Sequence, residues 1–151
     1  MMDEQFMREA LALAQLAADE GEVPVGAVVV KGDEIIGRGR NRREIGKNAL
    51  AHAEIEAINE ACRTLGGWRL SGCRLYVTLE PCPMCAGAII NARIDEVIYG
   101  TDDPKAGSCR SLVDLFALPY NHKPLCRAGV LEEECRAVLK EFFRTLRTRK
   151  G

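Results

Sequence analysis

The sequence has no excess of charge of either sign, because 21 lysine and arginine residues are matched by 22 aspartate and glutamate residues. The formal net charge of -1 excludes a uniformly basic protein of the histone type and argues, taken alone, against a nucleic-acid partner. The chain also has no apolar run long enough to cross a bilayer. It begins with acidic and polar residues, Met-Met-Asp-Glu-Gln, unlike a signal peptide. We therefore expect a cytoplasmic protein that makes no membrane contact.

Internal repeats, low-complexity tracts and linkers are also missing. The 151 residues are 47% apolar and 28% charged, a balance that is typical of a globular protein and argues against disorder. The length predicts a single domain over residues 1–151, with enough chain for a hydrophobic core.

Hydrophobic periodicity predicts alternating helices and strands. The expected helices are 3–18, 51–65, 82–91, 131–146 and a short one at 111–116. The expected strands are 23–30, 34–38, 74–79 and 96–100. The first two strands form a hairpin, with a turn at 31–33, and this order indicates an α/β sandwich around a mixed sheet.

The seven cysteines are an odd number and form no repeating framework, which favours a reducing compartment and metal or redox chemistry over disulfides. Cys82 and Cys85 form a Cys-x-x-Cys motif at the start of an expected helix, where both sulfurs lie on one side of the first turn. A structural zinc site would need a second pair at the usual spacing, and none is present. A thioredoxin-like redox pair is the main alternative.

His52 decides between these interpretations, because the chain has only two histidines and this one stands at the start of another expected helix. One histidine and two cysteines supply three ligands and leave the fourth tetrahedral position for water, which is the catalytic pattern of zinc. By itself His52 could equally cap or pack near a helix. Together with the cysteine pair it predicts a metal site of His52, Cys82 and Cys85.

Glu54 is the expected proton carrier, as general base and then general acid. In a regular helix residues i and i+2 point to nearly opposite sides, so His52 and Glu54 can cooperate only if His52 lies at the helix entrance. The alternative, a surface glutamate, suits Glu56 and Glu60 better.

The segments His52-Ala53-Glu54 and Pro81-Cys82-Pro83-Met84-Cys85 resemble the signature of the zinc-dependent nucleic-acid-base deaminases. Over almost its whole length the chain resembles the bacterial tRNA-specific adenosine deaminases of the cytidine/deoxycytidylate deaminase superfamily. The matching blocks are 23–27, 51–55, 79–88, 103–107, 121–122, 129–135 and 142–147. Those at 129–135 and 142–147 discriminate best, since they lie outside the shared metal motif.

The resemblance implies a three-layer α/β/α sandwich with a mixed central sheet of about five strands, as in cytidine deaminases. It implies a hydrolase that converts the wobble adenosine of a tRNA anticodon stem-loop to inosine and releases ammonia. Zinc, one ion per chain, would be held by His52, Cys82 and Cys85, and Glu54 would move protons. The family is typically a homodimer.

The same resemblance assigns substrate contacts. Asn41 matches a base-reading asparagine, although from the residues alone it would be a turn residue. Phe143 matches the end of the last helix near the anticodon, although a phenylalanine at helical spacing is more often part of a core. The implied substrate-binding residues are Asn41, Ala53, Asp103, Lys105, Phe143 and Arg144.

One position departs from the family pattern. Arg110 stands where a small residue, often glycine, is expected.

Two segments carry a local excess of positive charge. Residues 38–47 contain five basic side chains against one acidic, and residues 144–151 contain four basic side chains and no acidic one. Because phosphate attraction depends on the local field, these segments are compatible with a small RNA footprint despite the neutral total.

Two other functions remain open on the sequence. A deaminase of a free nucleobase or nucleoside (guanine, cytosine or cytidine) would use the same metal and fold without an RNA surface. A non-catalytic zinc-binding interaction module is the other, and three ligands with Glu54 at this offset argue against it.

Overall fold

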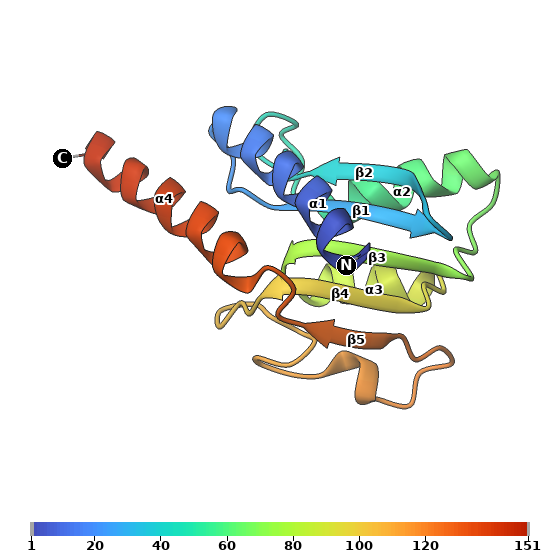
Figure 1. Cartoon of the computed structure of the whole chain (residues 1–151). Coiled ribbons are helices and arrows are strands. Elements are labelled where there is room, and N and C mark those ends of the chain that lie inside the picture. Colours follow the sequence, from blue (N-terminus) through green and yellow to red (C-terminus); the bar gives the residue numbers. More distant parts are fainter. Residues whose placement is uncertain (1, 151) are drawn as a thin grey trace.

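The computed structural model describes residues 2–150 (Figure 1). Its helices are α1 (Met2–Asp19), α2 (Ala53–Leu65), α3 (Pro83–Asn91) and α4 (Glu132–Lys150), with a 3₁₀ helix, η1 (Leu115–Ala117). Its strands are β1 (Gly26–Lys31), β2 (Glu34–Arg40), β3 (Cys73–Leu79), β4 (Glu96–Thr101) and β5 (Leu125–Ala128). They form one sheet in the order β2-β1-β3-β4-β5, with β1 antiparallel to both neighbours and β3, β4 and β5 parallel.

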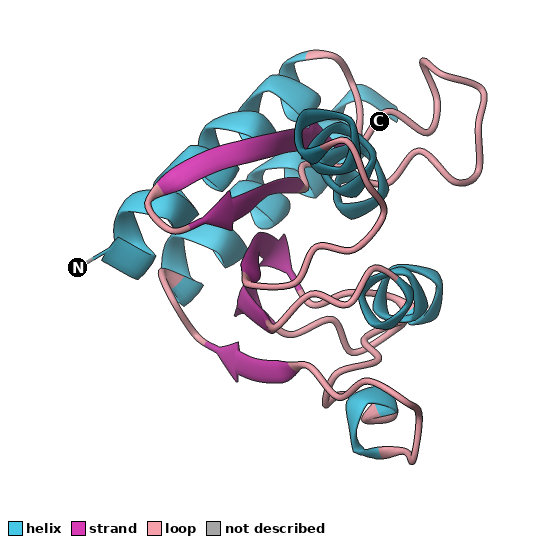
Figure 2. Cartoon of the chain, turned by 90° about the vertical axis from the view of Figure 1, so that its right-hand side faces the viewer, coloured by secondary structure: helices cyan, strands magenta, loops and turns pink. Residues whose placement is uncertain are grey.

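Helices cover both faces of the sheet, which confirms the expected three-layer α/β/α sandwich with a mixed five-stranded sheet. One face packs Val29 and Leu75 against α2 and α3, and the other packs Val28 and Tyr76 against α1 and the start of α4. Figure 2 shows α2 and α3 nearly end-on at one side of the strands. The core is therefore divided by the sheet into two layers.

The start of α1 is tied to the sheet by a polar cluster. Asp3 accepts hydrogen bonds from the Tyr76 hydroxyl at 2.6 Å and from Arg127 at 2.7 Å, and Arg127 also donates to Glu96. The bond from Arg127 is the largest influence that lowers the pKa of Asp3 below its ordinary value. These contacts join α1 to β3, β4 and β5.

Helix α2 lies unusually close to β2 because two glycines of the strand face it. A Cβ atom at Gly39 would lie 2.1 Å from the carbonyl oxygen of Ala53, and one at Gly37 would lie 2.2 Å from that of Ala57. The helix presents Ala53, Ala57 and Ala61 along this contact, with the Cβ of Glu56 beside Gly39. Since Ala53 is the first residue of α2, this close packing sets where the helix begins relative to the sheet.

The ends of several elements meet at one edge of the sheet. Strands β2, β3 and β4 run in the same direction, so their carboxyl ends lie together, and α2 and α3 begin there (Figure 1). In sheets with parallel strands this edge is the usual place for a binding site.

Two sequence predictions of local structure need correction, and one strand has no counterpart among them. The strand expected at 23–30 begins only at Gly26, and the preceding valines border a pocket instead. The helix expected at 111–116 is absent apart from the short η1, which starts where the Asp114 carboxylate accepts the N–H of Phe116. The position of the fifth strand, β5, was not predicted, because all four of its residues are exposed and show no apolar alternation.

The last helix also differs from expectation. The apolar residues at helical spacing, Leu131, Cys135, Val138, Phe142 and Leu146, predict one buried face, but only Cys135 is fully buried, whereas Leu146 is exposed. Cys135 packs on β4 where Gly100 leaves room: a Cβ atom there would lie 2.3 Å from the Cys135 sulfur. Beyond this contact α4 extends away from the sheet (Figure 1). The side chains of Arg149 and Lys150, part of the basic tail, lie outside the described residues.

Within residues 2–150, no helix combines the length and the apolar character that a bilayer crossing requires.

Candidate active site

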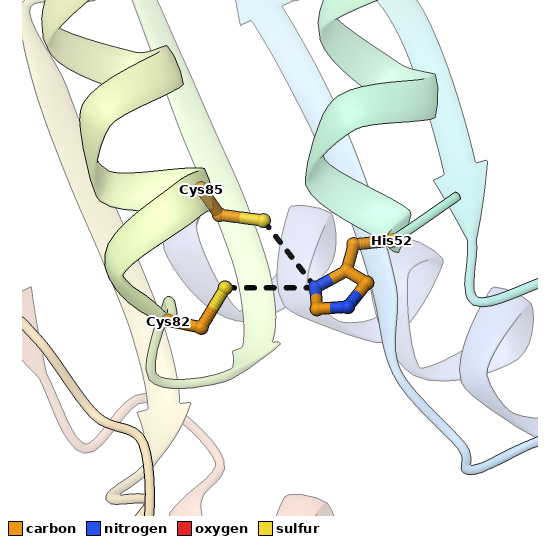
Figure 3. Close-up of side chains that lie close together, drawn as sticks. All are labelled: His52, Cys82 and Cys85. Carbon is orange, nitrogen blue, oxygen red and sulfur yellow. Dashed lines mark hydrogen bonds between the residues drawn. The ribbon is translucent and has the colours of Figure 1, made fainter. Parts of the chain in front are cut away.

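The three predicted metal ligands lie together at the sheet edge where α2 and α3 begin. The Nδ1 atom of His52 is 3.6 Å from the sulfur of Cys82 and 3.6 Å from the sulfur of Cys85 (Figure 3). One ligand atom from each of the three residues lies within 4.8 Å of the others, and no other such group occurs among the described residues. Residues separated by 30 positions in sequence thus converge on one point.

The ends of the two helices bring the ligands together. His52 is the N-cap of α2, with an extended backbone (φ -81°, ψ 154°), and Cys82 is the N-cap of α3 (φ -75°, ψ 175°). His52 therefore precedes the helix. The rule that residues i and i+2 of a helix point to opposite sides does not apply to it and Glu54. Pro83 occupies the first turn of α3, where a missing N–H costs nothing.

The spacing of the ligand atoms fits a tetrahedral metal ion. With a metal–sulfur distance of about 2.3 Å and a metal–nitrogen distance of about 2.05 Å, tetrahedral angles separate neighbouring N and S atoms by about 3.6 Å. Both N–S separations in the cluster have this value. The donor set of one imidazole and two thiols suits a borderline-soft ion.

The electrostatics of the cluster favour a thiolate. Hydrogen bonds from Cys85 and from His52 lower the pKa of Cys82 to about 4, and the pKa of Cys85 is raised in turn because it shares a proton with Cys82. The contact with Cys82 also raises the pKa of His52. The pair of cysteines thus holds a negative charge ready for a cation.

Glu54 lies beside the cluster in a pocket of about 210 Å³. Only 4% of its surface is exposed, and burial raises the pKa of its carboxyl to about 7. The pocket lining also includes His52 and Cys82, whereas Cys85 lies behind it, fully buried. A small planar group that enters the pocket would therefore meet a buried carboxyl and the cluster together.

Comparisons with known proteins give the family. A family model described as MafB19-like deaminase matches residues 1–147. The tRNA-specific adenosine deaminase of Bacillus subtilis (strain 168) is 50% identical over 149 residues, which cover 98% of this chain and 92% of that protein. The chain belongs to this deaminase family.

Solved structures agree. One solved structure comes from work on A-to-I editing by tRNA:A34 deaminases at the wobble position of transfer RNA. It superposes on this chain with a TM-score of 0.87 at 46% identity, and the match covers 89% of this chain and 99% of that chain. The guanine deaminase of Bacillus subtilis gives a TM-score of 0.64 at 34% identity, covering 96% and 93% of the two chains.

The six predicted substrate-binding residues divide between two hollows. Asn41, Ala53 and Asp103 line the pocket with Glu54. A second hollow of about 740 Å³ is lined by Pro104, Leu139 and Phe143 and by five basic residues, Lys105, Arg136, Lys140, Arg144 and Arg147. The turn at 103–106 forms part of the wall of both hollows.

The Asn41 amide retains capacity for a ligand. Its Nδ2 donates to the Val23 carbonyl at 3.2 Å, and its Oδ1 accepts the Arg43 N–H at 3.1 Å. An amide has two N–H donors and two lone pairs, so one of each remains. Asn41 is therefore both a turn residue, as its sequence alone indicates, and a residue of the pocket.

Two other predicted contacts are accessible. Phe143 is 40% exposed and contacts half-buried Phe142 edge-on, with ring centroids 5.3 Å apart. Arg144 pairs with Glu141 on the same helix. Arg110, the departure from the family pattern, turns its side chain to Asp102 at 2.8 Å and away from the pocket, so the arginine is accommodated outside it.

Two buried glutamates escaped the sequence prediction. Glu22 is 1% exposed and accepts the N–H groups of Glu44 and Ile45 at 3.1 and 2.7 Å, which holds the basic loop after Asn41. Glu80 is 2% exposed and holds the loop that follows β4. For Glu80 the available signal was an isolated acidic residue at the end of an apolar strand, whereas Glu22 follows Asp19 and Glu20 and gives no such signal.

Proposed function

We propose that the deaminase hydrolyses the wobble adenosine of a tRNA anticodon loop to inosine. The observation that carries this proposal is that the cluster of His52, Cys82 and Cys85 shares its pocket with Glu54, next to a basic hollow at α4, in a chain 50% identical to a tRNA-specific adenosine deaminase. A free base would need the pocket only. The second hollow, with its basic side chains and exposed Phe143, suits an RNA backbone and an unstacked base.

His52, Cys82 and Cys85 would hold one zinc ion, since the distances and donor atoms fit it. When bound, zinc supplies a Lewis acid that makes water nucleophilic at neutral pH. In the reaction water adds at C6 of adenine, the C6–N bond breaks and ammonia leaves. Glu54 accepts a proton from the attacking water and delivers it to the departing amino group.

The remaining pocket residues hold the base. The free N–H and lone pair of Asn41 are placed to pair with the purine edge. Ala53 begins α2, so its N–H has no acceptor within the helix and can steady negative charge that develops on the base. Asp103 shapes the pocket wall, because its carboxylate accepts the N–H groups of Lys105 and Ala106.

The first prediction concerns substrate class. Incubation with an anticodon stem-loop carrying a wobble adenosine should give inosine and one ammonia per inosine, measured by mass spectrometry of the digested RNA. Free adenosine, cytidine and guanine, tested in parallel, should remain largely unchanged, because they cannot use the α4 hollow. Turnover of the small molecules without turnover of the stem-loop would contradict the assignment and favour the free-base alternative.

We also propose that residues 1–151 form one deaminase domain that acts as a homodimer in the cytoplasm. An apolar hollow of about 760 Å³ runs along the outer side of α3, lined in part by Ile55, Met84, Ile90 and Leu115. Leu50 and Tyr120, which also line it, are 57% and 50% exposed. Contiguous apolar surface of this kind is typical of an interface between copies of one chain.

The dimer has a direct test. Tyr120→Glu should place a charge in the apolar interface and shift the chain from dimer to monomer, measured by light scattering after size-exclusion chromatography. Leu125→Glu is the matched control, since Leu125 is 68% exposed on β5 and does not line the hollow. A wild-type monomer, or an unchanged dimer in the Tyr120 variant, would contradict the proposed interface.

A further inference from the structure

Glu80 is a buried carboxylate that the proposed chemistry does not use. It follows the last residue of β3 and stands two residues before Cys82, and only 2% of its surface is exposed. No ion pair of the described residues compensates its charge, because the nearby Arg110 directs its guanidinium to Asp102 instead. A buried carboxylate is stable only if hydrogen bonds replace its hydration.

Those hydrogen bonds all come from the loop after β4. One carboxylate oxygen accepts the N–H of Asp103 at 3.0 Å and the hydroxyl of Ser111 at 2.5 Å. The other accepts the N–H groups of Cys109, Arg110 and Ser111 at 3.0, 2.8 and 2.9 Å. Burial acts to raise the pKa of Glu80, but these bonds outweigh it and hold the pKa below its ordinary value.

The loop closes tightly around this carboxylate. A Cβ atom at Gly107 would lie 2.3 Å from the carboxyl carbon of Glu80 and 2.5 Å from the carbonyl oxygen of Asp103. Residues 102–114 contain no helix or strand, so no regular hydrogen-bond ladder sets the direction of their N–H groups. The convergence of four of these groups and a hydroxyl on one anion sets it instead.

The loop in turn forms the wall between the two hollows. Asp103 and Ala106 line the pocket with Glu54, while Pro104 and Lys105 line the basic hollow beside α4. The main chain of Glu80 leads directly into the turn that carries Cys82. The Glu80 side chain therefore connects the metal-binding turn with the segment that faces both hollows, beside one main-chain bond, from the Ser108 N–H to the Pro81 carbonyl at 2.9 Å.

We propose that Glu80 is a positioning residue, which holds the 103–111 loop in the shape that RNA binding requires and ties that loop to the metal-binding turn. The proposal rests on the function proposed above, because it assigns the loop to substrate binding. Glu80 belongs to the lining of the pocket with Glu54, but both of its carboxylate oxygens are bonded to the loop, so it acts through the loop.

Glu80→Gln tests this role with almost no change in shape. The amide NH₂ of glutamine would face N–H donors where the carboxylate now accepts them, so one side of the loop loses its hydrogen bonds. We expect KM for the anticodon stem-loop to rise roughly 100-fold, with kcat changed less than about fivefold, because binding and not chemistry is disturbed. Zinc content should stay at that of the wild type.

A second readout does not depend on activity. Amide hydrogen exchange at Asp103, Cys109, Arg110 and Ser111 should accelerate in the variant, while exchange in α2 and α3 stays unchanged. Ser111→Ala, which removes one donor only, should give the same pattern with a rise in KM of about tenfold, and it keeps the test valid if the Glu80 variant does not fold.

Glu60→Gln is the control, because Glu60 also accepts a main-chain N–H, that of Arg38 at 2.9 Å, but lies outside both hollows.

The outcomes separate the two proposals. Unchanged KM with unchanged loop exchange in the Glu80 and Ser111 variants would overturn the positioning role. A fall in kcat alone, with unchanged exchange, would also overturn it and would place Glu80 in the chemistry itself. If the wild-type chain does not convert the stem-loop, the proposed function fails, and the exchange measurement still decides whether Glu80 holds the loop.

Discussion

Glu54→Gln is expected to lower kcat for the stem-loop by about 10³-fold, within the range of about 10²–10⁴-fold that a positioned general acid–base group contributes. Glutamine has nearly the shape of glutamate, so the packing of α2 should be preserved at this buried position. It cannot accept a proton from water and return it to the amino group. Because the three ligand atoms are untouched, zinc should remain at about one ion per chain.

Glu56→Gln is the matched control. Glu56 lies two residues further along α2, is half-buried and does not line the pocket, so its variant should keep the wild-type kcat and zinc content. Zinc would be measured by mass spectrometry of the metal, and kcat by ammonia release at saturating RNA. Loss of zinc from the Glu54 variant, or wild-type turnover in it, would show that Glu54 does not carry the proton.

The metal cluster was predictable because the information that defines it is local. Cys82 and Cys85 share the first turn of one helix, and His52 and Glu54 share the entrance of another, so each pair is set by a spacing of two or three residues. The structure adds the geometric reason that His52 and Glu54 lie close enough to cooperate: His52 is an extended N-cap residue and not part of the helix. The helix entrances meet because parallel strands end at one edge of the sheet.

The walls of the pocket were not predictable in the same way. The bonds from Glu80 to the loop after β4 span 23 to 31 residues, and those from Glu22 to the loop after Asn41 span 22 and 23 residues. No local pattern encodes such contacts. The same applies to β5, whose four exposed residues show no apolar alternation although they pair with β4. It applies also to α4, whose apolar stripe predicts burial that the fold supplies only at Cys135.

The fold also determines where the charged side chains gather, which the total charge does not reveal. A nearly neutral chain concentrates five basic side chains in the hollow at α4, and the acidic partners of Arg136 and Arg144 lie on the same helix and not on the loop across the hollow. Attraction for phosphate depends on this arrangement and falls as salt rises. The total charge of -1 therefore excludes indiscriminate binding and leaves room for a small RNA site.

Cys85→Ser is expected to abolish zinc binding and activity together. Serine has nearly the size of cysteine, so the start of α3 should still pack, but a neutral hydroxyl is not among the usual zinc ligands and two ligands remain. Zinc should fall below about 0.1 ion per chain after dialysis against a chelator, with turnover at background. Cys85 does not line the pocket, so the loss cannot come from a missing contact with the base.

Cys73→Ser separates this effect from the general cost of replacing a buried thiol. Cys73 is as buried as Cys85, lies in β3, and directs its thiol to the Ser71 carbonyl at 3.9 Å, outside the cluster. Its variant should keep one zinc per chain and wild-type turnover, while both variants lose comparable thermal stability before metal is added. Zinc retained by the Cys85 variant would remove that cysteine from the ligand set, and zinc lost from both variants would mean that the fold, and not the thiol, holds the ion.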